Sequence, residues 1–567
     1  MKNCKMKKTI INNLLILLIT VIVISCEGYL DPGYDEFLEE DEVFISYNYA
    51  LNYVRTIYSY LPTDAYDETF MTDETKHSDE GSNYNIMNNG SWDSRTYVEG
   101  WRWGHYYSGI RRVHIFLENV DTAIFLNPNT YKTTPSLNDT LRKQYKAEAR
   151  FLRAFYYFEL LKRFGDPRNN LGVPIIPEVA LSITDELDYE RNTYEECVNY
   201  IVADCDYAAG ILPNRWLTAN ADYGRASKAA ALALKSRLLL YAASPLANPN
   251  EDVNKWIKAA KAAKVVLDLP SYQLINNVSD NMLSIFTDPN NDEVLFSSPV
   301  ISSNNFEANN FPPSFSGNGQ INPTQDLVDA FETILGYPIE HQNSGYVPEN
   351  PYYRRDNRLR FFIVLNGSSI DGVPVDSYVG GKDGLSSLNK ATKTGYYIRK
   401  FIDPTADIIN NRDVATHFWV HFRYAEMLLN YAEAMAEAYG IQTIPAGYTM
   451  SAYQAYDMVR DRAGQNTQFT YTTTMSQEEF IERVRNERRV ELCFEGHRFW
   501  DVRRWNQGET YFNGPIHGMR IESTDSSTFS YEVFEVENRL FDSKMNVMPI
   551  PYDEIQRSDK LTQNEGW

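Results

Sequence analysis

The side chains with the clearest potential for chemistry are three glutamates near the C-terminus, Glu487, Glu491 and Glu495, spaced four residues apart. On a helix this spacing places all three on one face. A pair such as Glu491 and Glu495 could therefore hydrolyse a glycosidic bond, which two carboxyl groups cleave when they flank it at a separation of about 5 to 9 Å.

The arginines around these glutamates argue against catalysis. They are Arg485, Arg488, Arg489, Arg498, Arg503 and Arg504. Adjacent guanidinium groups lower the pKa of a carboxyl group, whereas a general acid needs a raised pKa. They also neutralise carboxylates that would otherwise repel one another. We therefore predict a partly buried ionic lattice that fixes the end of a helix against the rest of the domain.

Other signatures of catalysis or metal binding are missing from the sequence. It contains neither H-E-x-x-H nor G-x-S-x-G, and its eight histidines, His497 included, show no metal-ligand spacing. We predict a protein with no catalytic residue, no metal and no cofactor.

A stretch from Asp73 to Trp101 has the residue types of a binding surface. It shows no helical or strand period, so we expect a loop. A sugar site needs flat aromatic faces together with planar polar groups that bind hydroxyls. We predict that five of its residues contact a ligand: Asp73, Tyr84, Trp92, Arg95 and Trp101. The alternative is that Trp92 and Trp101 tuck beneath the loop and anchor it.

Further aromatic candidates lie between residues 270 and 415. We predict that Tyr378 and Tyr396 extend the ligand surface, together with Phe311, Phe315 and Asn318. The same residues could instead fill the core of that region.

These residues must be positioned by a largely helical chain. Capping boxes at Thr193–Glu196 and Ser476–Glu479, an Asp139 cap, and glycine or proline stops predict where helices begin and end. The expected helices span residues 49–60, 100–120, 141–164, 193–212, 227–243, 254–267, 418–439, 451–463 and 476–495. Small-residue helices in neighbouring pairs are typical of tetratricopeptide hairpins, although no strict 34-residue period is present.

The middle of the chain differs from both ends. Residues 270–415 are rich in Asn, Ser, Gly and Pro, which predicts an irregular lobe inserted into the helical scaffold. We expect one domain over residues 46–567, with scaffold at about 46–268 and 416–567 and the lobe at about 269–415.

The N-terminus has the pattern of an export signal. Lys5, Lys7 and Lys8 precede an apolar run, Leu14–Ile24, that is too short to span a bilayer core of about 30 Å. Val23-Ile24-Ser25-Cys26 fits a lipobox, so we predict a signal peptide at 1–25, lipidation of Cys26 and an acidic tether at 26–45. A plain signal peptide, in which Cys26 is incidental, is the alternative.

Composition excludes some partners. The formal charge of −22 and the pI near 4.9 argue against nucleic acid, which requires a concentrated basic face. Without Cys4 and Cys26, three cysteines are left: Cys197, Cys205 and Cys493. Cys197 and Cys205 would lie about 12 Å apart on one helix, too far to bridge, so we expect all three to pack as small hydrophobic residues.

Five sequence blocks resemble one family. They are AEARFLRAFYYFELLKRFGDP (147–167), RYAEMLLNYAEA (423–434), VRDRAG (459–464), ERRVELCFEGHRFWDVRRW (487–505) and MPIPYDEI…LTQNEGW (548–567). In this order they are similar to the signatures of the SusD/RagB family, starch-binding and other nutrient-uptake lipoproteins of the Bacteroidetes outer membrane.

The resemblance implies a fold and a function. The fold would be a mostly α, tetratricopeptide-like scaffold with a loop-rich lobe. The protein would face the outside of the cell, bind an oligosaccharide and deliver it to a SusC-like TonB-dependent transporter without breaking any bond. A peptide- or protein-binding helical-repeat lipoprotein is the alternative.

Overall fold

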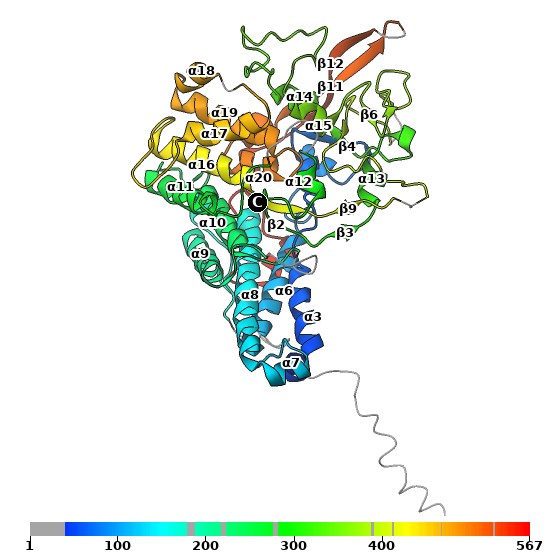
Figure 1. Cartoon of the computed structure of the whole chain (residues 1–567). Coiled ribbons are helices and arrows are strands. Elements are labelled where there is room, and N and C mark those ends of the chain that lie inside the picture. Colours follow the sequence, from blue (N-terminus) through cyan, green and yellow to red (C-terminus); the bar gives the residue numbers. More distant parts are fainter. Residues whose placement is uncertain are drawn as a thin grey trace, which may run out of the picture. The chain divides into compact units, whose positions relative to one another are not determined.

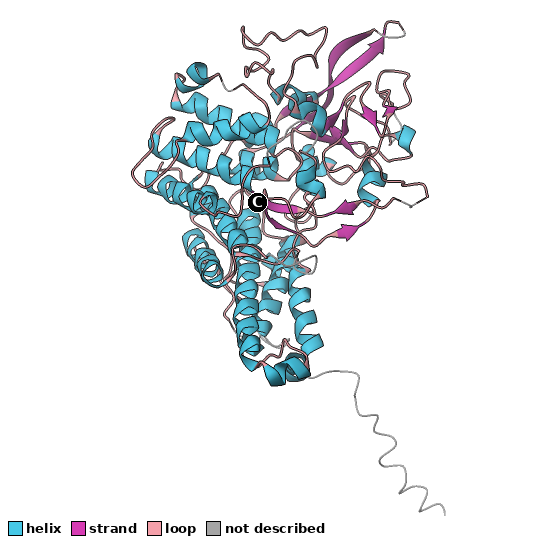
Figure 2. Ribbon diagram, in the orientation of Figure 1, coloured by secondary structure: helices cyan, strands magenta, loops and turns pink. Residues whose placement is uncertain are grey.

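The computed structural model describes residues 40–178, 188–216, 223–275, 282–386, 390–410, 413–466, 468–525 and 528–567. Helices dominate, and the strands are mostly short (Figure 2). The predicted signal peptide, Cys26 and residues 26–39 of the predicted acidic tether lie outside the described residues. The described residues form two compact units, one containing residues 40–53 and 119–142, the other drawn from residues 54–118 and from residue 143 onward. The proposed boundaries of the export signal, tether and single domain stay a prediction.

In the first unit, side-chain hydrogen bonds tie the loop after α6 (Arg102–Asn119) to α8 (Pro135–Phe164). This unit holds α2 (Glu40–Ile45), the start of α3 (Tyr47–Tyr58), α7 (Pro128–Thr133) and the start of α8. Asn138 accepts a hydrogen bond from the Phe125 N–H at 2.7 Å and donates to the Ala123 carbonyl at 3.0 Å. The predicted start of α8 at residue 141 is wrong. Pro135 begins the helix, as proline favours the first helical position, and Asp139 lies inside it.

The second unit contains a row of packed helices, including α6 (Arg102–Asn119) and the rest of α8. Neighbours along the row are α9 (Tyr194–Ile211), α10 (Lys228–Ala243), α11 (Val253–Leu267), α16 (Tyr424–Tyr439), α17 (Ala452–Arg462) and α19 (Gln477–Glu491) (Figure 1). Although the lobe separates α11 from α16 in sequence, these two helices pack side by side. The scaffold predicted on both sides of the lobe is therefore one continuous tetratricopeptide-like array.

Local caps explain where these helices begin. Thr193, Ser451 and Ser476 each form a capping box, and the Ser227 hydroxyl accepts from the Ala230 N–H at 3.2 Å. Each cap satisfies backbone N–H groups that a helix start leaves unpaired. The predicted starts at 193, 227, 451 and 476 are confirmed.

Two predicted boundaries in the C-terminal third are wrong. Helix α16 begins at Tyr424 rather than 418, because Val420–Arg423 form strand β10, which pairs with β2 (Val294–Ser297). Helix α19 ends at Glu491. Phe494 and Gly496 then adopt φ of 64° and 76°, and α20 (His497–Arg504) follows. A side chain at Gly496 would also meet Ala65, with Cβ atoms 2.4 Å apart.

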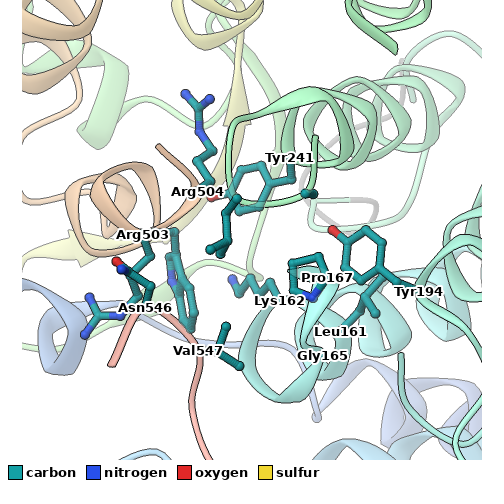
Figure 3. Close-up of a pocket in the computed structure, with 13 residues that line it drawn as sticks. Leu161, Lys162, Gly165, Pro167, Tyr194, Tyr241, Arg503, Arg504, Asn546 and Val547 are labelled. Carbon is teal, nitrogen blue, oxygen red and sulfur yellow. The ribbon is translucent and has the colours of Figure 1, made fainter. Parts of the chain in front are cut away.

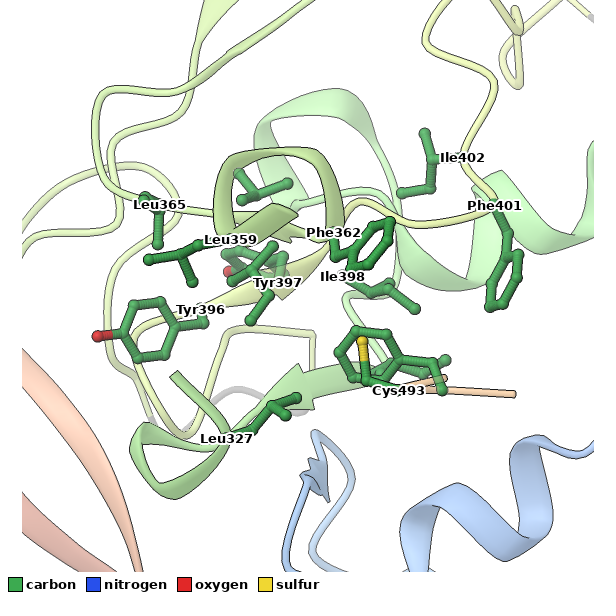
Figure 4. Packing of buried hydrophobic residues seen from close by; sticks show 14 of the residues in the cluster. Leu327, Leu359, Phe362, Leu365, Tyr396, Tyr397, Ile398, Phe401, Ile402 and Cys493 are labelled. Carbon is green, nitrogen blue, oxygen red and sulfur yellow. The ribbon is translucent and has the colours of Figure 1, made fainter. Parts of the chain in front are cut away.

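The lobe is built from short elements around an apolar core, as predicted for an irregular insert. Its elements are α12 (Ser284–Thr287), β2, β3 (Ile301–Ser302), α13 (Asn305–Asn310), β4 (Ile321–Pro323), α14 (Gln325–Ala330), α15 (Arg358–Phe362), β5 (Ile363–Val364), β6 (Ser369–Ile370), β7 (Val373–Pro374) and β8 (Tyr397–Ile398), followed by β9 (Thr416–His417). Leu327, Leu359 and Phe362 pack in its core with Cys493 (Figure 4).

Two further elements hold the lobe and residues 73–101, the stretch that was predicted to be a loop and that we call the aromatic loop. Strand β1 (Thr75–His77) pairs with β4, and the unpredicted hairpin β11 (Gly514–Ser523) with β12 (Phe529–Arg539) packs its Met519 and Ile521 into the lobe core. Cys197, Cys205 and Cys493 are buried and free, as predicted. Within the described residues, none of the helices combines the length and apolar character needed to cross a membrane.

Candidate functional site

The glutamates near the C-terminus do form a buried ionic lattice, but their partners differ from those predicted. Glu491 is bound by Arg358 of α15 at 2.9 Å, by Arg423 of β10 at 2.7 Å and by Arg462 of α17. Arg358 and Arg460 neutralise Glu487, and Lys400 and Arg423 neutralise Glu495. The arginines of α19 and α20 pair elsewhere, for example Arg504 with Glu433 at 2.6 Å.

This lattice does not provide a catalytic acid. Burial alone would raise the pKa of Glu491, but Arg462, Arg423 and Arg358 hold that pKa far below its usual range. Burial acts in the same direction on Glu495, and Arg423 and Lys400 again lower its pKa. Both carboxyl groups are therefore ionised at neutral pH, and neither is suited to donate a proton to a leaving group.

Asp73 forms a separate buried ionic cluster with Arg489 and Arg498 and is not a ligand contact. Its carboxylate is buried and accepts hydrogen bonds from Arg498 at 2.8 and 2.9 Å, and Arg489 lies 2.9 Å away. Burial would raise the pKa of Asp73, but the two arginines lower it to about 2. The prediction that Asp73 binds a ligand is wrong, because both of its oxygens already bind arginines.

Trp92 anchors the loop to the C-terminus. It is only 4% exposed, and its ring centroid lies 4.4 Å from that of Trp567, the last residue. The predicted ligand role of Trp92 is corrected accordingly, because its ring is covered. Arg95 is exposed, and its guanidinium lies 4.2 Å from the ring centroid of Tyr552 in α22 (Tyr552–Arg557).

Tyr396 fills the lobe core instead of facing a ligand. It is 0% exposed, and its hydroxyl lies 2.9 Å from that of Tyr352 and donates to Gln325 at 2.6 Å (Figure 4). Its predicted ligand contact is wrong, since the core encloses it. Tyr378 is partly exposed, and its ring centroid lies 5.5 Å from that of Phe529 in β12. Phe311 is buried, and Phe315 packs against the same core.

Trp101 is the predicted aromatic residue with an open ring. It is 54% exposed and immediately precedes α6. The Arg102 guanidinium lies 4.1 Å from the ring centroid of Trp101. The ring centroid of His105 lies 5.2 Å from it in an edge-to-face arrangement. Cation–π contact and packing therefore hold the indole in place while much of it faces solvent.

Trp101 and Tyr84 are linked through two residues that were not predicted. Arg102 lies 3.8 Å from Asp67 of α4 (Tyr66–Phe70), and the same carboxylate accepts a hydrogen bond from the Tyr84 hydroxyl. Asp64 is close enough to Asp67 for its pKa to be raised, first by burial and then by that charge. We call Asp64, Asp67, Tyr84, Trp101 and Arg102 the Trp101 surface.

The Trp101 surface combines the groups that recognise a sugar. The indole offers a flat apolar face, and Asp67, Tyr84 and Arg102 add hydrogen-bonding groups around it. Arg102 is itself positioned, because it lies 3.8 Å from Glu99, which binds Arg163 at 2.7 Å. Two signals in the sequence could have identified these residues as part of the site. Arg102 directly follows Trp101, and Asp67 is one of three acidic residues between Asp64 and Glu68.

A separate cavity beside α8 and α20 is too small for such a ligand. It measures about 40 Å³ and is lined by Lys162, Tyr194, Tyr241, Arg503 and others (Figure 3). Burial lowers the pKa of Lys162 to about 8, and its ammonium pairs with Glu159 at 2.6 Å. This volume suits water rather than a sugar ring. In the described part of the chain, no cluster of three His, Cys, Asp or Glu side chains could hold a metal ion.

Comparisons with known proteins give a consistent result. A family model described as "SusD family" matches residues 284–567, and one described as "Starch-binding associating with outer membrane" matches residues 30–240. "SusD-like protein P2" of Formosa agariphila is 27% identical over 437 residues, covering 74% of this chain and 73% of that protein.

Solved structures share the fold. A SusD-like protein from Bacteroides fragilis superposes with a TM-score of 0.76 at 27% identity, covering 94% of this chain and 99% of that one. A SusD-like carbohydrate-binding protein, also from Bacteroides fragilis, superposes with a TM-score of 0.72 at 22% identity, covering 91% and 99% of the two chains.

Proposed function

The chain belongs to the SusD family, and we propose from this membership that it binds an oligosaccharide at the outer membrane and delivers it to a SusC-like TonB-dependent transporter. Its activity would be capture and transfer, with no bond made or broken. A partly matching model for starch-binding proteins associated with the outer membrane supports this proposal.

The observation that carries the proposal is the exposed, immobilised indole of Trp101. A ring that is held by Arg102 from one side loses little conformational freedom when a sugar stacks on it. Asp67 and the Tyr84 hydroxyl lie along the same surface. The Tyr84 O–H donates to Asp67, so both residues offer acceptor oxygens to sugar hydroxyls. Arg95 and Tyr378 both reach solvent and would make outer contacts with the ligand.

Isothermal titration calorimetry against plant, fungal and host oligosaccharides tests this role. We expect Trp101→Ala to weaken binding of the preferred glycan about 5- to 150-fold, because stacking on an aromatic side chain contributes about 1–3 kcal/mol. Tyr353→Ala is the matched control, since Tyr353 is also 54% exposed but lies in the lobe. Equal loss in both variants, or no loss in Trp101→Ala, would refute the assignment.

The proposal includes a lipid anchor at Cys26, on the outer face of the cell. The lipobox-like sequence before Cys26 and the acidic residues after it support this location. Several acyl chains at about 0.8 kcal/mol per buried methylene would anchor the protein stably. The protein would then cover the transporter as a hinged lid.

A further inference from the structure

Two hollows adjoin each other at the end of the helical scaffold where the chain enters the lobe. The larger one has a volume of about 450 Å³ and the smaller one about 70 Å³, and Asn290 lines both. Their walls come from the segments before α10, after α11 and around β2. We call this pair of hollows the Trp216 hollow, after the tryptophan in the smaller one.

One wall of the Trp216 hollow is aromatic. Trp216, Tyr223 and Tyr272 line the smaller hollow. The Trp216 indole is held in place, because its N–H donates to the Ala226 carbonyl at 2.8 Å and the Arg225 guanidinium lies 3.7 Å from the ring centroid. Trp216 and Tyr223 are partly exposed, so their rings are accessible from the hollow.

The other wall carries planar polar side chains. Gln273, Asp288, Asn290 and Asp292 line the larger hollow. Asp292 accepts hydrogen bonds from Arg215 at 2.8 Å and from Gln273 at 3.3 Å, and the Asn290 amide donates to the Tyr223 hydroxyl. Asn290 therefore joins the amide and carboxylate wall to the aromatic wall.

Charge in the Trp216 hollow is balanced within the protein. Arg215 pairs with Asp292 at 2.8 Å, and Arg225 pairs with Glu148 at 2.5 Å. An anionic ligand would have to compete with these carboxylates for the guanidiniums, at a cost in lost ion pairs. Uncharged hydroxyl groups can add to amide and carboxylate oxygens without breaking them.

We propose that the Trp216 hollow is a second binding site, which takes a neutral oligosaccharide. Its larger part falls within the range of about 300–1,000 Å³ that ligand sites occupy. None of its lining residues belongs to the Trp101 surface, so the two are separate sites.

The test uses the full-length mature chain carrying Trp101→Ala, so that the Trp101 surface contributes little. Calorimetry measures binding of maltohexaose, cellohexaose, xylohexaose and laminarihexaose, with hexagalacturonate as the charged comparison. We expect at least one neutral hexasaccharide to bind this variant, and the further substitution Trp216→Ala or Asn290→Ala to raise its Kd at least tenfold.

Asn290→Ala is the deciding variant, because Asn290 is exposed while Trp216 supports the backbone at Ala226. Tyr353→Ala in the same background should leave the Kd unchanged. The proposal is overturned if no neutral hexasaccharide binds the Trp101→Ala protein, if Asn290→Ala leaves the Kd within twofold, or if hexagalacturonate binds more tightly. Failure of the Trp101 assignment is a different result, since it shows as unchanged affinity of Trp101→Ala relative to wild type.

Discussion

At the scale of single residues, exposure separates the two tryptophans of the aromatic loop. The Trp101 ring packs against the Arg102 guanidinium and is exposed to solvent, whereas the Trp92 ring is covered by Trp567. They lie nine positions apart in similar polar surroundings, so local composition does not distinguish them. The difference arises from the C-terminal residue, which is 475 positions further along the chain than Trp92 and whose indole N–H donates to the Val547 carbonyl at 2.8 Å.

Substitution of Trp92 therefore affects stability. We expect Trp92→Ala to lower the free energy of unfolding by about 3–5 kcal/mol, because it leaves a cavity against Trp567. Trp101→Ala should change it by less than about 0.5 kcal/mol, as substitutions at exposed sites usually do. Urea unfolding followed by circular dichroism measures both. A Trp92→Ala protein as stable as wild type would show that the contact with Trp567 contributes nothing.

At the scale of elements, the ionic lattice joins α15, α17, α19 and β10. Glu491 receives arginines from three of these elements, so loss of its charge leaves several guanidiniums buried without a partner. Breaking a buried ion pair by removing one partner costs about 3–5 kcal/mol.

Glu491→Gln tests this role. We expect a loss of stability of about 3–5 kcal/mol, with the affinity of the remaining folded protein for glycan unchanged. Glu482→Gln is the control, because the Glu482 side chain is 46% exposed and solvent screens its ion pair with the buried Arg485. Equal stability of the two variants would contradict a structural lattice.

The buried carboxyl groups also predict how stability depends on pH. Burial, followed by the charge of Glu99, raises the pKa of Glu68 in α4 to about 7, and burial raises that of Glu74 to about 7 as well. A carboxyl group whose folded pKa is raised binds more protons in the folded state than in the unfolded state. The stability that this group contributes is therefore fully present at pH values below its unfolded pKa of about 4.5, and it is lost as the pH rises through the folded pKa of about 7.

We expect the melting temperature to fall between pH 5 and pH 7.5, and Glu68→Gln to reduce that fall, since glutamine mimics the protonated acid. Differential scanning calorimetry at fixed ionic strength measures both curves. Below pH 4.5 the sign reverses, because the lowered pKa values of Asp73 and Glu159, each about 2, make stability fall as the pH drops through them. Identical slopes for wild type and Glu68→Gln above pH 5 would contradict the role of Glu68.

Local features made much of the scaffold predictable. The side chains of Thr193, Ser451 and Ser476 each accept a hydrogen bond from the backbone N–H three positions ahead. Both partners of each capping interaction are therefore visible within four residues of sequence. The end of α19 was missed because Phe494 adopts a left-handed conformation that few non-glycine residues take.

Contacts between segments that lie far apart in the chain could not be predicted from the sequence. Arg358 lies 133 positions from Glu491, and the strand β10 depends on pairing with β2. Within the candidate site, Trp101 and Tyr84 were predicted to contact a ligand from their residue types. The carboxylate that joins them belongs to Asp67, which lies in a separate helix, α4.

At the scale of the whole molecule, the proposed function requires that a lipid on Cys26 holds the protein at the membrane. We expect Cys26→Ser to move the protein from the membrane fraction to the soluble fraction and out of the detergent phase in Triton X-114 partitioning. Glycan affinity should be unchanged, because Cys26 lies 38 positions before Asp64, the first residue of the Trp101 surface. Persistent membrane association of Cys26→Ser would contradict the anchor.

The central claim is that a glycan stacks on Trp101 and bonds to Asp67 and Tyr84. A crystal structure of the protein with its highest-affinity oligosaccharide tests it most directly. We expect a sugar ring parallel to the Trp101 indole, with a hydroxyl within hydrogen-bonding distance of the Asp67 carboxylate. A ligand bound at full occupancy that touches neither Trp101 nor Asp67 would contradict it.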